Sequence, residues 1–514
     1  MYLNALIQKI FIIISSTIII ISYGYSSYLY SGNKLVFLLF FFTIHFYLLV
    51  SFFLSNLIFD KVLSTFLWLG FYLTIVFKII FKFYVINEGE GNFRFLPYQF
   101  DTVLIWTSVA VMAFITSSIF HRFIIKIKKL NDDKNFKLIE FYNNYKYKIL
   151  FLFFILIILV NFYNFQFEVY QKGILPVFKA YPFLQMIIKF FVIFGLTAIS
   201  TVLIDYDIKS KNRLTFLVLL IFYFEIFTTN IVLLSRSFIF IGGFILLSIL
   251  ISNKIKKENT NYLNSFLINI IFFSFIYIIS IQVINSVRSD RFFNPDFVYS
   301  QEVEKIKKEN LDKLVEADMI AEKKIVRDNR ISKREEENNS ITFKKKIYNN
   351  FKTISILIQR RFVGFESLAI VTSSNRQSKE AFWSSFKEKV NTNHHQSYYS
   401  TKFMSPKHRN FTRGSSKQVS VFLPGVIAFF SYYGSLVFLF ISLLLIHSFS
   451  GFVEKIAYSL SFNSKIFSSF VGYTLAYRLI HFGYVPKNSY MLLTAIFISI
   501  FGIFIISKLI KKYY

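Results

Sequence analysis

Long apolar runs recur along almost the whole chain, separated by short polar stretches. A helix needs about 20 apolar residues to cross the hydrocarbon core of a bilayer, and the runs of this length predict about twelve transmembrane helices. We expect helices throughout, because an open sheet cannot satisfy its backbone hydrogen bonds in lipid. The pattern therefore predicts an all-α, polytopic membrane protein. The expected spans lie near residues 5–23, 35–57, 62–80, 102–121, 148–164, 184–204, 213–233, 237–253, 264–284, 420–447, 465–482 and 489–507.

One long hydrophilic segment, from about residue 285 to 419, interrupts this pattern. It divides the chain into a membrane domain of about nine helices (1–284), a large loop (285–419) and C-terminal membrane helices (420–514). Within residues 301–339, apolar residues recur among charged ones and predict one or two amphipathic helices. A solvated charged helix without a ligand is the simpler interpretation of that stretch. Any chemistry outside the membrane is expected in this loop.

The distribution of basic residues predicts the orientation. The 514 residues are 54% apolar and 17% charged, and the formal net charge is +29. Much of the excess lies in short loops beside apolar runs, where positive charge favours the cytoplasmic side and meets anionic headgroups. This location explains the charge without a nucleic-acid partner, and we expect none. The bias is satisfied when both termini are cytoplasmic, which places the large loop outside.

Several kinds of chemistry lack their sequence signatures. The chain has no Cys, which excludes disulfides, thiol catalysis and Cys-ligated metals. Motifs for binding nucleotide phosphates or dinucleotides, for zinc proteolysis and for a nucleophile elbow do not occur in a suitable context. His394 and His395 are adjacent and have only His408 nearby, so we predict no metal site and no cofactor. Glu225, in the middle of an expected span, is either a proton site or a hydrogen-bonded structural group.

Three groups of arginines lie at the expected outer side of the membrane. Arg236 occupies a tight turn between two spans, Arg288 and Arg291 follow the ninth span, and Arg360 and Arg361 lie within an apolar stretch. A guanidinium stays ionised and binds phosphate oxygens in bidentate fashion, so these side chains suit a lipid diphosphate. Snorkelling to the headgroups is the alternative for each. It explains the last pair least well, since two charges in an apolar run need a partner.

Two loop residues are candidates for a general base. His408 carries an imidazole, whose unperturbed pKa is near neutrality; its alternative is a surface position in the basic run 407–413. Glu366 lies five positions after Arg361 and is either a carboxylate base or the salt-bridge partner of an arginine. Residues 383–411 are rich in His, Tyr, Trp, Asn and Ser, a mixture that can stack on sugar rings and bind their hydroxyls. Folded loops without a glycan have similar compositions.

Together these features resemble the bacterial O-antigen and oligosaccharide repeat-unit polymerases of the Wzy type. Besides the outer arginines, two stretches carry the resemblance, Gln359-Arg-Arg-Phe-Val-Gly364-Phe-Glu-Ser-Leu368 and Leu423-Pro-Gly425-Val-Ile-Ala-Phe-Phe-Ser-Tyr-Tyr-Gly434. The body plan is similar to that of GT-C membrane glycosyltransferases, with one large, partly helical periplasmic loop. The chain departs from the family in one respect. Many relatives carry an acidic residue within the second stretch, and this chain has none between Gly425 and Gly434.

The resemblance implies a glycosyltransferase of the bacterial inner membrane that needs no metal or cofactor. It would transfer a growing glycan from undecaprenyl diphosphate to a sugar hydroxyl of a new lipid-linked unit, at the periplasmic face. The diphosphate is an activated leaving group, so no nucleotide motif is needed. His408 or Glu366 would take the proton of the acceptor hydroxyl. The arginines would bind diphosphates and stabilise the leaving group; they are Arg236, Arg288, Arg291, Arg360 and Arg361.

The expected partners are undecaprenyl-diphosphate-linked oligosaccharide, membrane lipids and a polysaccharide chain-length regulator. Two alternatives remain open. An O-antigen ligase shares the body plan and the arginines but uses lipid A core as its acceptor. A lipid-linked oligosaccharide flippase or other transporter also has about twelve spans, but usually has short outer loops and two similar halves.

Overall fold

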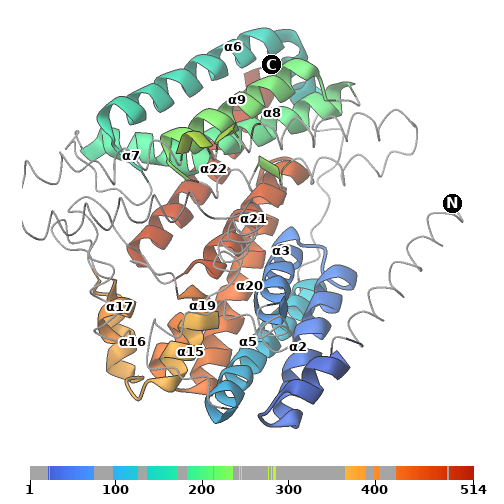
Figure 1. The fold of residues 1–514 in the computed structure, drawn as a ribbon. Coiled ribbons are helices and arrows are strands. Elements are labelled where there is room, and N and C mark those ends of the chain that lie inside the picture. Colours follow the sequence, from blue (N-terminus) through green and yellow to red (C-terminus); the bar gives the residue numbers. More distant parts are fainter. Residues whose placement is uncertain are drawn as a thin grey trace, which may run out of the picture. The chain divides into compact units, whose positions relative to one another are not determined.

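The computed structural model of the chain is helical (Figure 1). Within the ranges that it describes, the only regular elements are α-helices and short π- and 3-10 segments, and no strand is present. The prediction of an all-α protein is thus confirmed for this part of the chain. Nearly all of the first expected span and the amphipathic helices expected at 301–339 lie outside the described residues. The described residues are 21, 23–73, 97–124, 136–171, 182–211, 214–235, 365–388, 397–403, 424–482 and 486–513, with isolated positions between 242 and 284.

Six helical stretches are long and apolar enough to cross a membrane, and they identify a membrane protein. Each overlaps an expected span, whereas the count of twelve remains a prediction. A shorter apolar helix is α9 (Phe216–Val232). Two further short helices are α3 (Ile58–Leu67), which η1 (Trp68–Leu73) continues, and α21 (Lys465–Ile480). The six long stretches are α2 (Lys34–Phe53), α5 (Pro97–Ile124), α6 (Phe136–Phe167), α7 (Pro182–Phe190) continued by η3 (Phe191–Gly195) and α8 (Leu196–Lys211), α20 (Leu436–Leu460) and α22 (Pro486–Tyr513).

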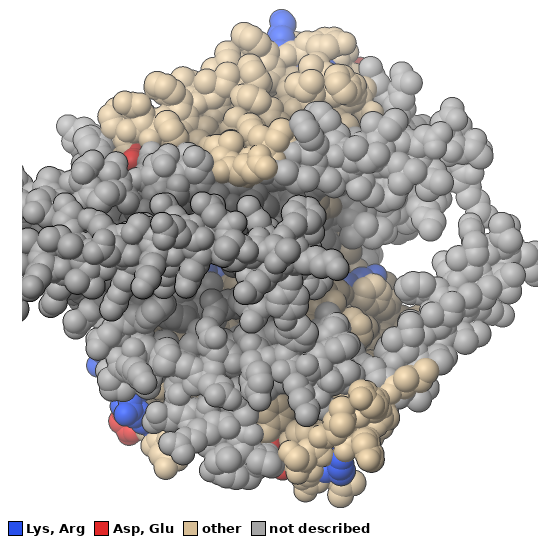
Figure 2. All heavy atoms as spheres, viewed as in Figure 1, with Lys and Arg blue, Asp and Glu red and all other residues tan. Residues whose placement is uncertain are grey.

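Helix α2 shows how an all-round apolar helix fits a membrane. The Asn33 side chain caps its first turn by accepting from the Leu35 backbone N–H at 2.9 Å. One stripe of α2 is buried in the protein: Phe37, Phe40, Ile44, Tyr47 and Ser51. The opposite stripe, which includes Leu38, Phe42, Leu49 and Phe53, is exposed and apolar. Lipid accounts for such a surface, whereas water does not. The surface seen in Figure 2 is likewise mostly uncharged where it is described.

The described helices pack in two neighbouring sets. In the first, α5 packs against α2 and α20, and α21 lies against α3, α8 and α20. In the second, α6, α8 and α9 contact one another, and α22 reaches from α6 to α20. Nearly every residue of α21 is buried. This helix therefore belongs to the protein core rather than to the lipid-facing surface.

The tenth span is predicted at residues 420–447, but the corresponding helix in the structure, α20, begins at Leu436. The residues before it form a short helix, α19 (Gly425–Phe430), and a 3-10 turn, η5 (Ser431–Tyr433). Gly434 ends this turn in the left-handed conformation, with φ of +81°, which a residue without Cβ adopts readily. Ser435 then caps α20. The aromatic residues of α19 and η5 are apolar, so the sequence alone does not distinguish them from a lipid-facing span. In the structure, rings such as Phe429 and Tyr432 are buried by other parts of the protein.

The last part of the expected loop is folded onto these helices. Helix α15 (Phe365–Ser373) contacts α5 and α19, helix α16 (Lys379–Ser385) contacts η5, and α17 (Tyr398–Lys402) contacts α16. The chain divides into two compact units, one of residues 1–287 with 362–514 and one of residues 288–361. The second unit lies outside the described residues, whereas α15 to α17 belong to the unit of the membrane helices.

Candidate functional site

The side chains assigned from the sequence to catalysis and to diphosphate binding are not described by the structure, and their roles stay predictions. Glu366 lies in the first turn of α15, where the structure describes the helical backbone alone. His394 and His395 are outside the described ranges as well. So are His408, Arg236, Arg288, Arg291, Arg360 and Arg361.

The stretch that contains Pro424 and Gly425 forms a layer with helices α15 to α17, which we call the loop layer (residues 365–388, 397–403 and 424–434). Two hydrogen bonds join its parts. The Ser378 backbone N–H donates to the Tyr432 carbonyl at 2.9 Å, and Gln377 Nε2 donates to the Ser431 carbonyl at 2.7 Å. At its other end, the Gly425 N–H donates to the Phe482 carbonyl at 2.9 Å. Residues 424–434 are thus fixed at one end to the residues just before α16 and at the other to the residue that follows α21 by two positions.

Aromatic rings fill the loop layer. The buried Phe382 ring is 5.6 Å from Phe429 and 4.9 Å from Phe438, measured between ring centroids. Trp383 is 5.2 Å from Phe382, but 54% of its surface is exposed. Burial raises the pKa of the Tyr432 phenol well above its usual value, which keeps this phenol neutral. An exposed indole on a rigid aromatic base can stack on the apolar face of a ring brought to it.

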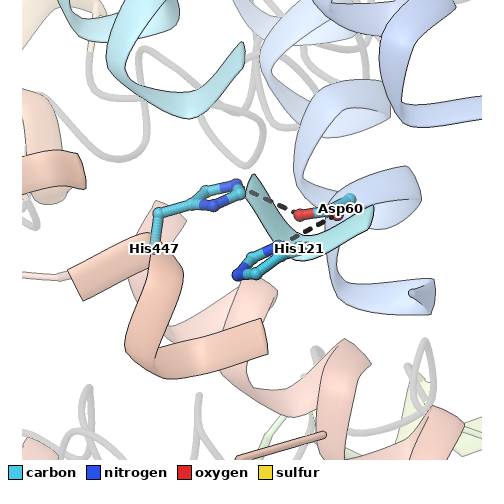
Figure 3. A group of neighbouring side chains, drawn as sticks. All are labelled: Asp60, His121 and His447. Carbon is cyan, nitrogen blue, oxygen red and sulfur yellow. Dashed lines mark hydrogen bonds and ion pairs between the residues drawn. The ribbon is translucent and has the colours of Figure 1, made fainter. Parts of the chain in front are cut away.

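A second candidate site lies inside the helix bundle and was not expected from the sequence. Asp60 on α3, His121 on α5 and His447 on α20 point toward one another (Figure 3). Asp60 Oδ2 is 3.3 Å from His121 Nδ1, and Asp60 Oδ1 is 3.3 Å from His447 Nε2. One ligand atom from each residue lies within 4.8 Å of the other two, and the exposed fractions are only 0%, 2% and 0%. We call these residues the buried triad.

Neighbouring polar groups hold the rings of the buried triad in place. The Ser448 carbonyl is 3.2 Å from His121 Nε2, and the Ser117 hydroxyl is 2.9 Å from His447 Nδ1. The Tyr47 hydroxyl is 3.0 Å from His447 Nε2, and Ser55 Oγ donates to Asp60 Oδ2. All three side chains are therefore oriented by groups outside the triad.

Two glycines let the helices approach closely enough to form this site. A Cβ atom at Gly451 would lie 2.3 Å from Cε1 of His121, so the imidazole occupies the space that a side chain would need. A Cβ atom at Gly472 would lie 2.3 Å from Oε2 of Glu454. Glu454 uses this space to accept hydrogen bonds from the backbone N–H groups of Ile58 (2.9 Å) and Phe59 (2.8 Å) at the start of α3.

The buried triad has no local sequence motif, which is why sequence reasoning missed it. Asp60 and His121 are 61 positions apart, and His447 lies far beyond both. A usable signal was present nonetheless. Ionisable side chains within apolar helices are costly unless they serve a site or pair with one another, and His121 and His447 both lie in spanning helices.

Glu225 on α9 is buried, as its place in an apolar run predicts. Its Oε1 accepts hydrogen bonds from Thr197 Oγ1 at 3.0 Å and from Thr229 Oγ1 at 3.4 Å. Its Oε2 receives no hydrogen bond of normal geometry among the described residues. These contacts agree with a structural role and with a protonated acid alike, so the two interpretations remain open.

No protein-family model, no curated protein and no solved structure matches this chain. The described part of the chain defines a class, the all-α membrane proteins, with a loop layer packed on the helix bundle and a buried triad within it.

Proposed function

We propose that the chain is a membrane glycosyltransferase that polymerises lipid-linked oligosaccharide repeat units at the outer face of a bacterial inner membrane. One observation carries this proposal. The two stretches that resemble the repeat-unit polymerases, residues 359–368 and 423–434, are far apart in the chain, yet α15, which begins within the first stretch at Phe365, packs against α19 from the second. Their contact favours a single functional region over two unrelated resemblances.

The reaction would be one displacement at the anomeric carbon of the donor glycan. The acceptor hydroxyl oxygen forms the new glycosidic bond to that carbon, and the bond from the carbon to the diphosphate oxygen breaks. The electron pair leaves with undecaprenyl diphosphate, and the acceptor proton passes to His408 or Glu366. Arginines such as Arg360 and Arg361 would stabilise the charge that develops on the leaving diphosphate. Trp383 offers a ring on which a sugar of either substrate can stack.

In the proposed topology, successive helices cross the membrane in opposite directions, so certain helix ends are expected on the same side. Contacts between such helix ends support this topology. The Tyr30 hydroxyl donates to Asp101 Oδ1 at 2.5 Å, and the Asn33 backbone N–H donates to the same oxygen at 3.0 Å. All three residues are expected on the outer side. Lys209 Nζ donates to the Asn463 carbonyl at 3.4 Å, and both are expected in the cytoplasm. In each case, ends expected on one side of the membrane meet.

The test is the ladder of surface glycan in cells that lack the gene and are complemented with variants. Wild type should restore the ladder, and Arg361→Ala should not do so at equal expression, since the leaving diphosphate loses its cation. Arg376→Ala is the matched control. It removes an arginine of the same loop whose guanidinium donates to the Lys402 carbonyl at 2.8 Å, and it should restore the ladder. Trp383→Ala should give shorter chains than wild type.

The same experiment separates the alternatives. Deletion of a polymerase leaves a single repeat unit attached to lipid A core. Uncapped core, with long glycan accumulating on undecaprenyl diphosphate, would identify a ligase instead. A ladder that is unchanged by the deletion would exclude both transferases and favour a transporter.

A further inference from the structure

We infer that the buried triad binds a divalent transition-metal ion that links α3, α5 and α20. Two imidazole nitrogens and one carboxylate form a ligand set that suits Zn²⁺, and also suits Fe²⁺ or Mn²⁺. The inference goes beyond the proposed function, because the ion would take no part in glycosyl transfer. It also differs from the sequence expectation of no metal, which considered His394, His395 and His408.

The first reason is the spacing of the ligand atoms. The His121 Nδ1 to Asp60 Oδ2 distance and the His447 Nε2 to Asp60 Oδ1 distance are both 3.3 Å, so each ring faces its own oxygen of one carboxylate. A charge-assisted hydrogen bond between an imidazolium and a carboxylate is shorter, at about 2.7–2.9 Å. Two ligand atoms that bind one ion at about 2.0–2.2 Å with a tetrahedral angle are separated by about 3.3–3.6 Å. The observed spacing therefore fits an ion between the ligands better than it fits direct ion pairs.

The second reason is the hydrogen bonding of His121. The Ser448 carbonyl, 3.2 Å from Nε2, can only accept a hydrogen bond, so Nε2 carries the proton. In the neutral ring, Nδ1 then has a lone pair, and that lone pair faces an oxygen of Asp60. Two acceptors in contact repel each other unless a cation lies between them. This cation is either a second proton on His121 or a metal ion.

The third reason concerns His447 and distinguishes these two cations. Its Nε2 is 3.0 Å from the Tyr47 hydroxyl and 3.3 Å from Asp60 Oδ1, yet Oδ1 receives no hydrogen bond from any described residue. If the cation were only a proton on His121, the contact between His447 Nε2 and Asp60 Oδ1 would have no hydrogen bond. Protonation of both rings would put two cations in a buried stack, since the rings are nearly parallel with centroids 5.5 Å apart. One metal ion would satisfy both Asp60 oxygens and the ring nitrogen that faces each of them, and the Tyr47 hydroxyl would then no longer need the Nε2 lone pair.

The surroundings of the buried triad favour a structural ion. Each imidazole has its second nitrogen occupied by a carbonyl or a hydroxyl, as metal-binding histidines usually do. The site is closed, since the triad side chains are almost inaccessible to solvent, whereas a catalytic ion keeps an open position for substrate. The ligands come from three helices that are distant in the chain. The ion would therefore close long loops and stabilise the folded state.

The experiment uses the full-length protein, purified in detergent, stripped with a chelator, supplied with Zn²⁺ and freed of excess ion. Metal content is measured by inductively coupled plasma mass spectrometry. Wild type should retain about one Zn²⁺ per chain, and His447→Ala and Asp60→Asn less than about a fifth of that amount. His481→Ala and Asp101→Asn remove the same chemical groups elsewhere, and they should retain about as much Zn²⁺ as wild type.

Stripping should also lower the unfolding temperature of wild type, and Zn²⁺ should restore it, because an ion bound to the folded state stabilises that state. This shift should be absent in His447→Ala. A wild-type protein that retains no Zn²⁺ would overturn the inference, even if the variants fail to fold. Equal Zn²⁺ in wild type and in a monodisperse His447→Ala protein would overturn it as well, because such binding would be to other groups.

Discussion

The imidazole of His121 lies against the backbone of α20 at Gly451, and a methyl group on residue 451 would clash with the ring. A Cβ atom there would come within 2.4 Å of Nε2, which is far inside van der Waals contact. The ring is also fixed by the Ser448 carbonyl and by Asp60. It therefore cannot move aside without breaking the buried triad.

We expect Gly451→Ala to destabilise the protein by about 1–3 kcal/mol, the usual range for an overpacked core. This loss should appear although Ala favours a helix over Gly by roughly 0.5–1 kcal/mol. The measurement is thermal unfolding in detergent. Gly502→Ala is the matched control, since a Cβ atom at that position of α22 meets nothing within 4 Å. Equal unfolding temperatures for the two variants would contradict the close packing of His121.

Among the helices, α3 depends most directly on a neighbour for its start. The first N–H groups of a helix have no partner within the helix. In α3, Glu454 of α20 accepts from two of them, at Ile58 and Phe59. Ser55 accepts from the Leu57 N–H at 3.1 Å and also donates to Asp60. The start of α3 and the buried triad are therefore parts of one polar structure.

Glu454→Gln should lower the unfolding temperature. The amide keeps one acceptor oxygen, and its NH₂ group then faces a backbone N–H, donor against donor. An unsatisfied buried group costs about 1–3 kcal/mol. Glu380→Gln makes the same change at the exposed first turn of α16 and should have little effect. A Glu454→Gln protein as stable as wild type would indicate that Glu454 does not hold α3.

The elements differ in how far the sequence could predict them. Long apolar runs were sufficient to predict that α2, α5, α6, α20 and α22 are present, though not all of their bounds, because length and hydropathy decide whether a helix can span lipid. They could not place the start of α20, since the aromatic residues of α19 and η5 just before it are also apolar but are buried in protein instead of spanning lipid. Their rings are covered by α15 and α16, and hydropathy does not tell protein from lipid. The buried triad was missed because helix packing, rather than sequence spacing, brings its residues together.

At the scale of the whole molecule, the orientation in the membrane rests on charge bias alone, and the absence of Cys makes it easy to test. Lys387 and Lys137 are both exposed, on the expected outer and inner sides respectively. In intact spheroplasts, a membrane-impermeant maleimide should label Lys387→Cys and not Lys137→Cys. Permeabilised cells should show labelling of both. The cysteine-free wild type is the control for background.

The opposite labelling pattern would invert the orientation and place the loop layer in the cytoplasm, away from any lipid-linked glycan exposed outside. Labelling of both positions in intact spheroplasts would mean that residues 137 and 387 share the outer side. That result would contradict the expected number of spans between them.

The burial of α21 has a consequence for how the protein is made. Its sequence contains Ser468, Ser469, Thr474 and Arg478, and such residues insert poorly into a bilayer on their own. Its packing partners α3, α8 and α20 all precede it in the chain. During synthesis, α21 therefore meets neighbours that are already in the membrane, and its polar side chains can pass from the translocon directly into protein. Moving this segment to an earlier position in the chain would remove that advantage.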